Sequence, residues 1–595
     1  MKTKILATAA LLAAGLFSAG ASTETLPEGY WSLQQAAEIL DKTRRVMLDP
    51  DLSALSEAER AAAARLIQAG VIINGLYEDS MHPEALDSLQ ALQAKDRDTE
   101  HSKALLDLYY LFRGPIATTL DNERVPFLPV AEEQPGKNMY PQGMRSESLD
   151  PLLQARPDLA PDLLAVRTVV RESNSQNLQR DLDMLDRFPV LDGLHPGLRP
   201  QLEAIRSGAD DSPWYALPYS VRWAPEVMEI HALINNAADL LKAGDPDFSA
   251  YLSLRARDLI SDDYEAGDAA WVRGRFGNLN AQIGSYEVYG DALYGVKSFF
   301  SLSLLARDEK KSRELSAALQ GLQEIQDSLP LGAGRKIQQD IPVGVYNIIA
   351  DFGQSRGANT ASILPNEAAQ TRKYGRIILL RNNIMTNPEL FDDRKALFSA
   401  AVISEQAGDL SLQGPFYRTL WHEVGHYLGV DTTQDQRDLN EALSPWGSHY
   451  EEMKADLLSL YTSAQLNAAG AMDDDLLRSV QAGGILRVLQ QNQPRMDQPY
   501  QTMQLMQMNY FLQNELLSFD PASARLTIHY GRYQQVASQL LEEVLAIQSA
   551  GSSERAGQFI EKYTAWEPDL HERLAQHLRE ASRYRFRMVQ YKALQ

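Results

Sequence analysis

Two histidines four residues apart carry the clearest chemical signal in this sequence. His422 and His426 belong to the pattern H-E-x-x-H. Positions i and i+4 lie on one face of a helix, so both imidazole rings can point at one metal ion. Glu423 lies beside that face, where it can hold a water molecule at the metal and remove its proton. The pattern therefore predicts a metal centre with hydrolytic chemistry.

A third ligand is expected from the next predicted helix, because catalytic zinc takes three protein ligands and keeps one position for water. Glu452 and Asp456 are again four residues apart on that helix. Glu452 completes a His, His, Glu set, and Asp456 can accept the other ring N–H of a ligand histidine. Glu451 is a second candidate for this supporting role. We predict one zinc ion per chain, held by His422, His426 and Glu452, in a helix–loop–helix arrangement that resembles the thermolysin-like zinc peptidases.

The composition limits the function classes that the rest of the chain can support. The 595 residues carry a formal net charge of −22 and no cysteine. The acidic balance argues against nucleic acid and anionic lipid as partners, since both attract clustered Lys and Arg. Absence of cysteine excludes disulfides, thiolate nucleophiles and thiolate zinc ligands. The length predicts two or more domains, and we expect a monomer or a weak homodimer.

The N-terminus has the pattern of a secretory signal over residues 1–21. Lys2 and Lys4 precede a short apolar stretch, and the A-x-A sequence at 19–21 is typical of a cleavage site after Ala21. The apolar stretch is short for a membrane span. We therefore expect a periplasmic or secreted protein that has no membrane contact once the signal is removed.

The hydrophobic pattern predicts a mainly α fold with a smaller β element, an α+β class. Helical patterns cover 33–112, 150–205, 225–264, 296–329 and most of the chain after 396. Ser56 and Glu59 are expected to form a capping box. Strand patterns cover 283–291, 336–351 and 374–382, and residues 362–367 are expected to form a loop or an edge segment.

Several separated motifs make the sequence similar to the dipeptidyl peptidase III family of zinc exopeptidases, from about residue 35 onward. The five-residue histidine motif matches a bacterial branch of that family, and E-E-M-K-A-D at 451–456 matches its second zinc motif. The resemblance implies that Glu452 binds zinc. The segment E-V-Y-G-D at 287–291 resembles the family's E-S-Y-x-D substrate motif, which implies substrate roles for Glu287 and Tyr289.

Two positions depart from the family pattern. The family's N-x-P-N substrate motif stands here as I-L-P-N, so Asn366 is kept and Ile363 replaces the first asparagine. The family also has a transition-state histidine after the zinc motifs, but residues 500–511 contain none, and Tyr500 is the candidate for that place. These changes leave the zinc site intact and bear on substrate preference and catalytic power.

The resemblance implies two lobes around a wide cleft, one helical with zinc and one with a small β-barrel. The lobes are expected to be discontinuous in sequence. We predict a signal peptide at 1–21, a β-containing lobe at 22–304 and 341–395, a zinc lobe at 305–340 and 396–580, and a C-terminal return segment at 581–595.

The chemistry expected from these residues is metal-assisted hydrolysis of a peptide bond. Glu423 would pass the proton of water to the leaving amine. Tyr289 is our preferred donor to the tetrahedral oxyanion because of the resemblance, with Tyr500 and His449 as alternatives. Glu287 and Asn366 would hold the ammonium group of a short peptide from which a dipeptide is released.

Two other function classes fit the same residues. A non-catalytic or weakly active peptide-binding protein would explain Ile363 and the missing histidine, although a binder has no use for Glu423 as a base. A zinc hydrolase of non-peptide substrates would use the same centre. A screen of di- to octapeptides with zinc measured on the same sample separates these alternatives.

Overall fold

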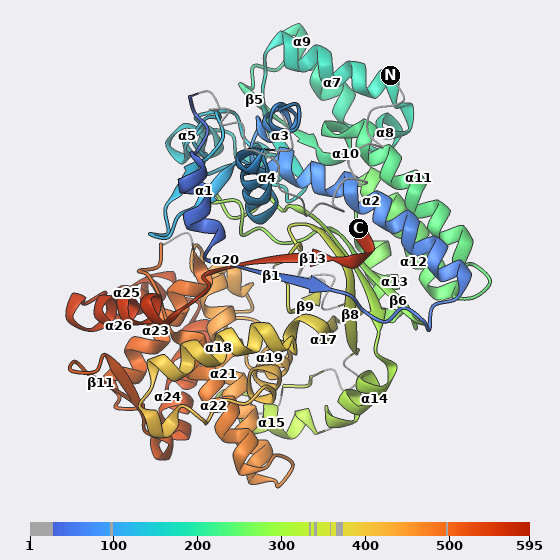
Figure 1. Ribbon diagram of the computed structural model, residues 1–595. Coiled ribbons are helices and arrows are strands. Elements are labelled where there is room, and N and C mark those ends of the chain that lie inside the picture. Colours follow the sequence, from blue (N-terminus) through green and yellow to red (C-terminus); the bar gives the residue numbers. More distant parts are fainter. Residues whose placement is uncertain are drawn as a thin grey trace. The chain divides into compact units, whose positions relative to one another are not determined.

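The computed structural model describes residues 28–95, 99–319, 321–332, 335–337, 342–357, 359–364, 373–495 and 498–595. Helices predominate and the strands form small sheets, which confirms the predicted mainly α fold with a smaller β element (Figure 1). The predicted signal at 1–21 lies outside the described residues, so export remains a prediction. Among the described helices, none has the length and apolar character needed to cross a membrane.

The contacts between residues divide the chain into two units that are both discontinuous in sequence. Unit 1 consists of Met1–Arg307, Ile348–Asn359 and Phe586–Gln595, and unit 2 consists of Asp308–Asn347 and Thr360–Arg585. The lobe boundaries, the cleft and the small barrel expected from the sequence remain predictions.

Unit 1 is built mainly from helices. Those with their bounds are α1 (Leu33–Leu40), α2 (Glu57–Met81), α3 (Ala85–Gln93), α4 (Glu100–Phe112), α5 (Ser146–Ala155), α6 (Ala160–Leu163), α7 (Ser175–Arg187), α8 (Pro189–Leu194), α9 (Leu198–Ser207), α10 (Tyr219–Arg222), α11 (Ala224–Leu241), α12 (Pro246–Ser261) and α13 (Glu265–Arg273). The start of α2 confirms the predicted capping box. The Glu59 backbone N–H donates to Ser56 Oγ at 3.2 Å, and the Ser56 N–H donates to Glu59 Oε2 at 2.7 Å. These two bonds satisfy backbone donors that a helix start leaves open.

Three two-stranded pairings lie in unit 1, and two of them correct the helical predictions over 33–112 and 150–205. Strand β1 (Thr43–Leu48) pairs in parallel with β13 (Phe586–Tyr591). The other pairs are antiparallel: β2 (Ile116–Thr118) with β3 (Arg124–Pro126), and β4 (Thr168–Glu172) with β5 (Trp214–Pro218). Each missed strand is short, and the partner of β1 lies at the other end of the sequence, so local periodicity gave no sign of the pairing.

A five-stranded sheet has the order β6 (Leu279–Ser285), β7 (Phe300–Arg307), β8 (Val343–Gly353), β10 (Ile377–Arg381) and β9 (Ala361–Leu364). Strands are present within 336–351 and 374–382 as expected, but the strand prediction over 283–291 holds only to Ser285, because β6 ends there and the residues that follow form a loop and turn. Residues 362–364 belong to the edge strand β9, in agreement with the edge segment expected there, and the rest of that segment lies outside the described residues. The prediction of helix over 296–329 is wrong for β7. Apolar residues and serines alternate along the first residues of this strand, which is the two-residue period of a sheet.

Unit 2 contains the helices that carry the predicted metal ligands. Its helices are α14 (Glu309–Ala318), α15 (Leu322–Ser328), α17 (Asn382–Met385), α18 (Pro388–Ala401), α19 (Gln413–Gly425), α20 (Leu439–Leu443), α21 (Gly447–Ala468), α22 (Asp474–Val488), α23 (Pro499–Gln513), α24 (Tyr530–Ala550), α25 (Ser553–Tyr563) and α26 (Arg573–Ala581). A hairpin of β11 (Leu517–Asp520) and β12 (Arg525–Ile528) follows α23. The apolar stripe of α23, including Met503 and Phe511, is buried in the core.

Candidate metal centre

Two helices of unit 2, α19 and α21, approach each other closely at Gly425. A Cβ atom added there would lie 3.0 Å from the Ala455 carbonyl oxygen and 3.1 Å from the Leu458 Cβ. These distances are tighter than ordinary carbon contacts, so glycine permits the two backbones to approach at this level. His422 lies in the last turn of α19, and His426 caps its C-terminal end. The close packing therefore holds both histidines against the face of α21 that carries Glu452.

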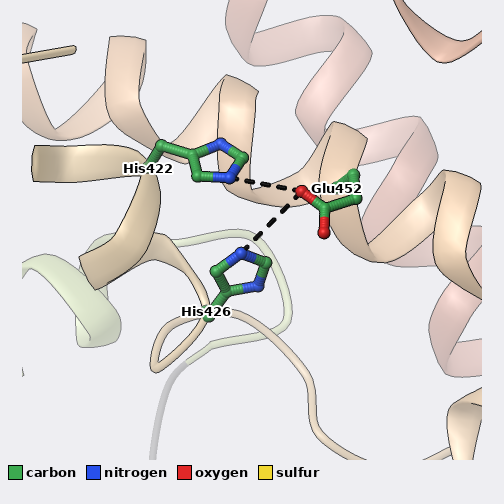
Figure 2. Close-up of side chains that lie close together, drawn as sticks. All are labelled: His422, His426 and Glu452. Atoms are coloured by element: carbon green, nitrogen blue, oxygen red, sulfur yellow. Dashed lines mark ion pairs between the residues drawn. The ribbon is translucent and has the colours of Figure 1, made fainter. Parts of the chain in front are cut away.

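The three predicted ligands meet at one carboxylate oxygen (Figure 2). Glu452 Oε2 lies 3.2 Å from His422 Nε2 and 4.0 Å from His426 Nε2. Ligand atoms of a tetrahedral zinc site are about 3.4 Å apart when each lies about 2.1 Å from the metal. Glu452 Oε2 is buried and has no hydrogen-bond partner in the described chain. A cation between these atoms would satisfy that oxygen, so the residues fit a metal ion.

Asp456 lies against the second ring nitrogen of His422. His422 Nδ1 lies 2.7 Å from Asp456 Oδ1, and the same oxygen accepts a hydrogen bond from Arg418 Nη1 at 2.7 Å. Arg487 Nε donates to the other carboxylate oxygen at 3.4 Å. Burial opposes the charge on Asp456, but the two arginines and His422 hold the pKa of its carboxyl well below the usual range. Asp456 therefore stays ionised and fixes the His422 ring with Nε2 directed at Glu452.

His426 has a matching partner in Glu451. Its Nδ1 lies 2.9 Å from Glu451 Oε1. Lys454 Nζ lies 2.9 Å from Glu451 Oε2, and Gln548 donates to that oxygen at 3.4 Å. Burial raises the pKa of Glu451, but Lys454 and His426 lower it by a larger amount, so the pKa of Glu451 is below its ordinary value. Both histidines thus have an ionised carboxylate behind them, an arrangement that raises the basicity of metal-ligating imidazoles.

The protonation of the metal-free cluster follows from these contacts. Burial lowers the pKa of His422, but the hydrogen bond to Asp456 and the nearby Glu452 carboxylate dominate and raise it to about 9. Burial raises the pKa of Glu452, but the two histidines and a hydrogen bond from Tyr500 bring it below the usual value. In the metal-free cluster His422 is therefore protonated near neutral pH, and its proton supplies the positive charge that a bound metal ion would supply.

Glu423 and Tyr500 lie in the same unit as the ligands. Glu423 follows His422 on α19 and is buried. Tyr500 begins α23, and its ring lies under the guanidinium of Arg487 with 5.6 Å from Cζ to the ring centroid. His449, three residues before Glu452, is buried and neither of its ring nitrogens has a partner among the described residues. Burial lowers the pKa of His449 to about 4, so the ring is neutral at physiological pH.

The predicted substrate residues belong to other parts of the fold. Glu287 and Tyr289 follow β6 in unit 1, and the Tyr289 side chain is exposed. Asn366 lies outside the described residues. Ile363, which replaces the family asparagine, is in β9 and pairs with Ile378 of β10.

Sequence reasoning missed the cations that stabilise the supporting carboxylates. Arg418 lies four residues before His422, so its place on the same helix face could have been inferred from spacing. Lys454 lies three residues after Glu451, which is also a helical contact spacing. Arg487 comes from α22, and no local spacing connects it to Asp456.

The structure of dipeptidyl-peptidase III from Corallococcus sp. strain EGB superposes with a TM-score of 0.80 at 21% identity, covering 95% of this chain and 98% of that chain. The structure of DPP III from Caldithrix abyssi gives a TM-score of 0.75 at 21% identity, covering 94% of this chain and 98% of that chain. This chain has their fold. The resemblance predicted from the motifs is thereby confirmed at the level of the fold.

Sequence comparison alone is less informative. No family model matches the chain. Nudix hydrolase 3 from Arabidopsis thaliana is 22% identical over 566 residues, which cover 88% of this chain and 70% of that protein.

Proposed function

We propose that this protein is a zinc-dependent peptidase that releases dipeptides from the N-terminus of short peptides. The observation that carries the proposal is the buried cluster of His422, His426 and Glu452, with an ionised carboxylate behind each histidine. The fold of two solved dipeptidyl peptidase III structures supports the same reaction class. The metal is assigned as zinc because a His, His, Glu set is a donor set that catalytic zinc takes in proteins.

Glu423 is assigned as the general base. When bound, zinc would polarise the substrate carbonyl and lower the pKa of water toward neutrality. Glu423 lies next to His422 on α19, so its carboxylate can take the proton of the attacking water and deliver it to the leaving amine. Asp456 and Glu451 keep the two imidazoles in the tautomer that presents Nε2 to the metal.

The substrate roles follow from the motifs. Glu287 and Asn366 are assigned to the N-terminal ammonium of the peptide, since carboxylate and amide oxygens accept hydrogen bonds from it. Tyr289 is assigned as the donor to the oxyanion of the tetrahedral intermediate. Tyr500, which hydrogen-bonds Glu452, is assigned to substrate contact on the metal side.

A peptide screen with metal analysis tests the proposal. Purified protein is incubated with di- to octapeptides, products are identified by mass spectrometry, and zinc is measured on the same sample. We expect dipeptide products and about one zinc per chain. His422→Ala and Glu452→Ala should lose zinc together with activity. Hydrolysis that persists in both variants at full zinc content would remove the assigned ligand set.

A further inference from the structure

A pocket in unit 1 is lined by several arginines, and these arginines are far in sequence from the metal ligands. Its volume is about 280 Å3, and it is lined by residues from the end of α4, the segment after β8 and strand β13. Arg113, Arg356 and Arg587 each come from one of these three segments. Three chain segments that are widely separated in sequence therefore each bring a guanidinium to one cavity.

Among the described residues, the hydrogen bonds of the three guanidinium groups all go to neutral oxygens. Arg113 Nη1 donates to the Gln354 carbonyl at 2.6 Å, and Arg356 Nη2 donates to the Tyr110 carbonyl at 2.7 Å. Arg587 Nη2 donates to the Gly357 carbonyl at 2.8 Å. None of the three forms a salt bridge with a carboxylate in the described part of the chain. Their positive charges are therefore not neutralised by direct contact.

Several guanidinium nitrogens remain available to a ligand. Arg113 Nη2, Arg356 Nε and Arg587 Nη1 make none of the hydrogen bonds found among described residues, and none of them is a fully buried atom without a partner. They keep solvent-accessible surface in side chains that are only partly exposed. A fork of N–H donors on a half-buried guanidinium matches the oxygens of an anion.

The acidic groups near the pocket are engaged elsewhere. A fourth lining arginine, Arg124, is paired with Glu133 at 2.7 Å. Glu78 is buried, and burial raises the pKa of its carboxyl despite the positive charge of Arg356. Asp351 accepts hydrogen bonds from Ser303 and from Tyr591. No carboxylate of the described residues contacts the three remaining cations, although the formal net charge of the chain is −22.

The walls of the pocket strengthen such an interaction. The Arg356 guanidinium stacks on the Tyr110 ring with 4.2 Å from Cζ to the centroid. Phe112 and Phe586 meet edge to face with 5.6 Å between their centroids. Aromatic surfaces exclude water and lower the local dielectric, so a charge-assisted hydrogen bond here is stronger than one at an open surface.

We propose that this pocket is a binding site for a compact oxyanion of the phosphate type, held by Arg113, Arg356 and Arg587. Guanidinium forks recognise phosphate oxygens in pairs, and three of them can surround a tetrahedral anion. The bound anion would link the end of α4, the segment after β8 and β13. The site lies within unit 1 and does not depend on the peptidase assignment.

Equilibrium dialysis with inorganic phosphate tests the site, with ionic strength held constant by sodium chloride. Arg113→Gln and Arg587→Gln are the pocket variants. Arg206→Gln is the matched control, because Arg206 is exposed on α9 and its loss changes the net charge equally. We expect saturable binding to the wild type, a weakening of about tenfold or more in each pocket variant, and no change in the control. Circular dichroism checks that each variant is folded.

A metal ion can itself bind phosphate, so the measurement is repeated after chelator treatment and with His422→Ala. Binding should persist in both samples. The proposal fails if wild-type binding does not exceed that in chloride alone, if it disappears with the metal, or if the control weakens as much as the pocket variants. Should Arg587→Gln not fold, Arg113→Gln and the wild type still give each of these outcomes.

Discussion

Asp456 does three things through one carboxylate. It lies within hydrogen-bonding distance of His422 Nδ1, forms a salt bridge with Arg418 at 2.7 Å and accepts a hydrogen bond from Arg487 at 3.4 Å. Its side chain is 2% exposed, so its charge depends on these partners for stabilisation. The orientation of a metal ligand and the neutralisation of two arginines are thus coupled at one residue.

The first prediction concerns Asp456→Asn. Loss of the negative charge should weaken zinc binding about ten- to a hundredfold, because the His422 ring loses its orienting partner. The same change leaves the buried Arg418 unpaired and should lower the free energy of unfolding by about 3–5 kcal/mol. Chelator competition and denaturant unfolding measure the two effects. Asp475→Asn, at an exposed site on α22, is the control and should change neither.

The second prediction concerns Glu423→Ala. This variant should keep zinc and fold while hydrolysis falls roughly a hundred- to ten-thousandfold, because the base is removed and the ligands are not. Peptide turnover and elemental analysis on one preparation provide the readouts. An undiminished rate would exclude Glu423 as the base.

The third prediction concerns protons. Zinc needs a neutral His422, whose pKa in the metal-free protein is raised to about 9. The free protein therefore carries a proton that the zinc-loaded protein lacks. Near pH 7, zinc uptake should release about one proton from this residue, and zinc affinity should rise as the pH approaches 9. Calorimetry in two buffers of different ionisation enthalpy measures the release, and zero release at pH 7 would contradict the contacts described for His422.

At the scale of elements, the approach of α19 to α21 depends on Gly425. The Ala455 carbonyl and the Leu458 side chain leave little room for a methyl group at Gly425. The Ala455 atoms in question belong to the helix backbone, so they cannot move away by a change of rotamer. The spacing of the two helices sets the distance between His422 and Glu452. A change in the contact between α19 and α21 should therefore change the affinity for the metal.

The fourth prediction compares two glycines. Gly425→Ala should destabilise the fold by about 1–3 kcal/mol and weaken zinc binding, because the added methyl forces the helices apart. Gly75→Ala, inside α2 with no atom within 4 Å of the added carbon, should instead stabilise by about 0.5–1 kcal/mol. Thermal unfolding and zinc affinity of both variants test this. Equal effects in the two variants would show that the close contact does not matter.

Local spacing predicted the elements that are defined locally and missed those defined by distant partners. His422, His426, Glu452 and Asp456 were predicted from i, i+4 periodicity, and the structure brings them together. Strand β7 was predicted as helix because its short apolar run fits either period until its pairing with β6 is known. Local spacing does not predict the contact of Arg487 with Asp456 or the grouping of the pocket arginines, because the residues that meet there come from chain segments far apart in sequence.

At the scale of the whole molecule, the fifth prediction concerns how a peptide end is recognised. If Glu287 and Asn366 hold the free ammonium, acetylation of the peptide N-terminus should cut hydrolysis about ten- to a hundredfold, the worth of a charge-assisted contact. Ile363 removes one amide of the family motif, so the lower end of that range is expected. Mass spectrometry of matched free and acetylated peptides gives the answer. Equal cleavage, or internal cuts without dipeptides, would make the protein an endopeptidase or another hydrolase.

The parallel pairing of β1 with β13 joins Thr43–Leu48 to Phe586–Tyr591. A ribosome makes β1 well before β13, and both segments of unit 2, Asp308–Asn347 and Thr360–Arg585, are made in the interval between them. Throughout that interval the edge of β1 that pairs with β13 has no partner strand from β13, and unpaired strand edges promote aggregation of nascent chains. The pairing of β1 with β13 therefore cannot form until all of unit 2 and most of unit 1 have been made, so its timing is set by the whole stretch of chain between the two strands.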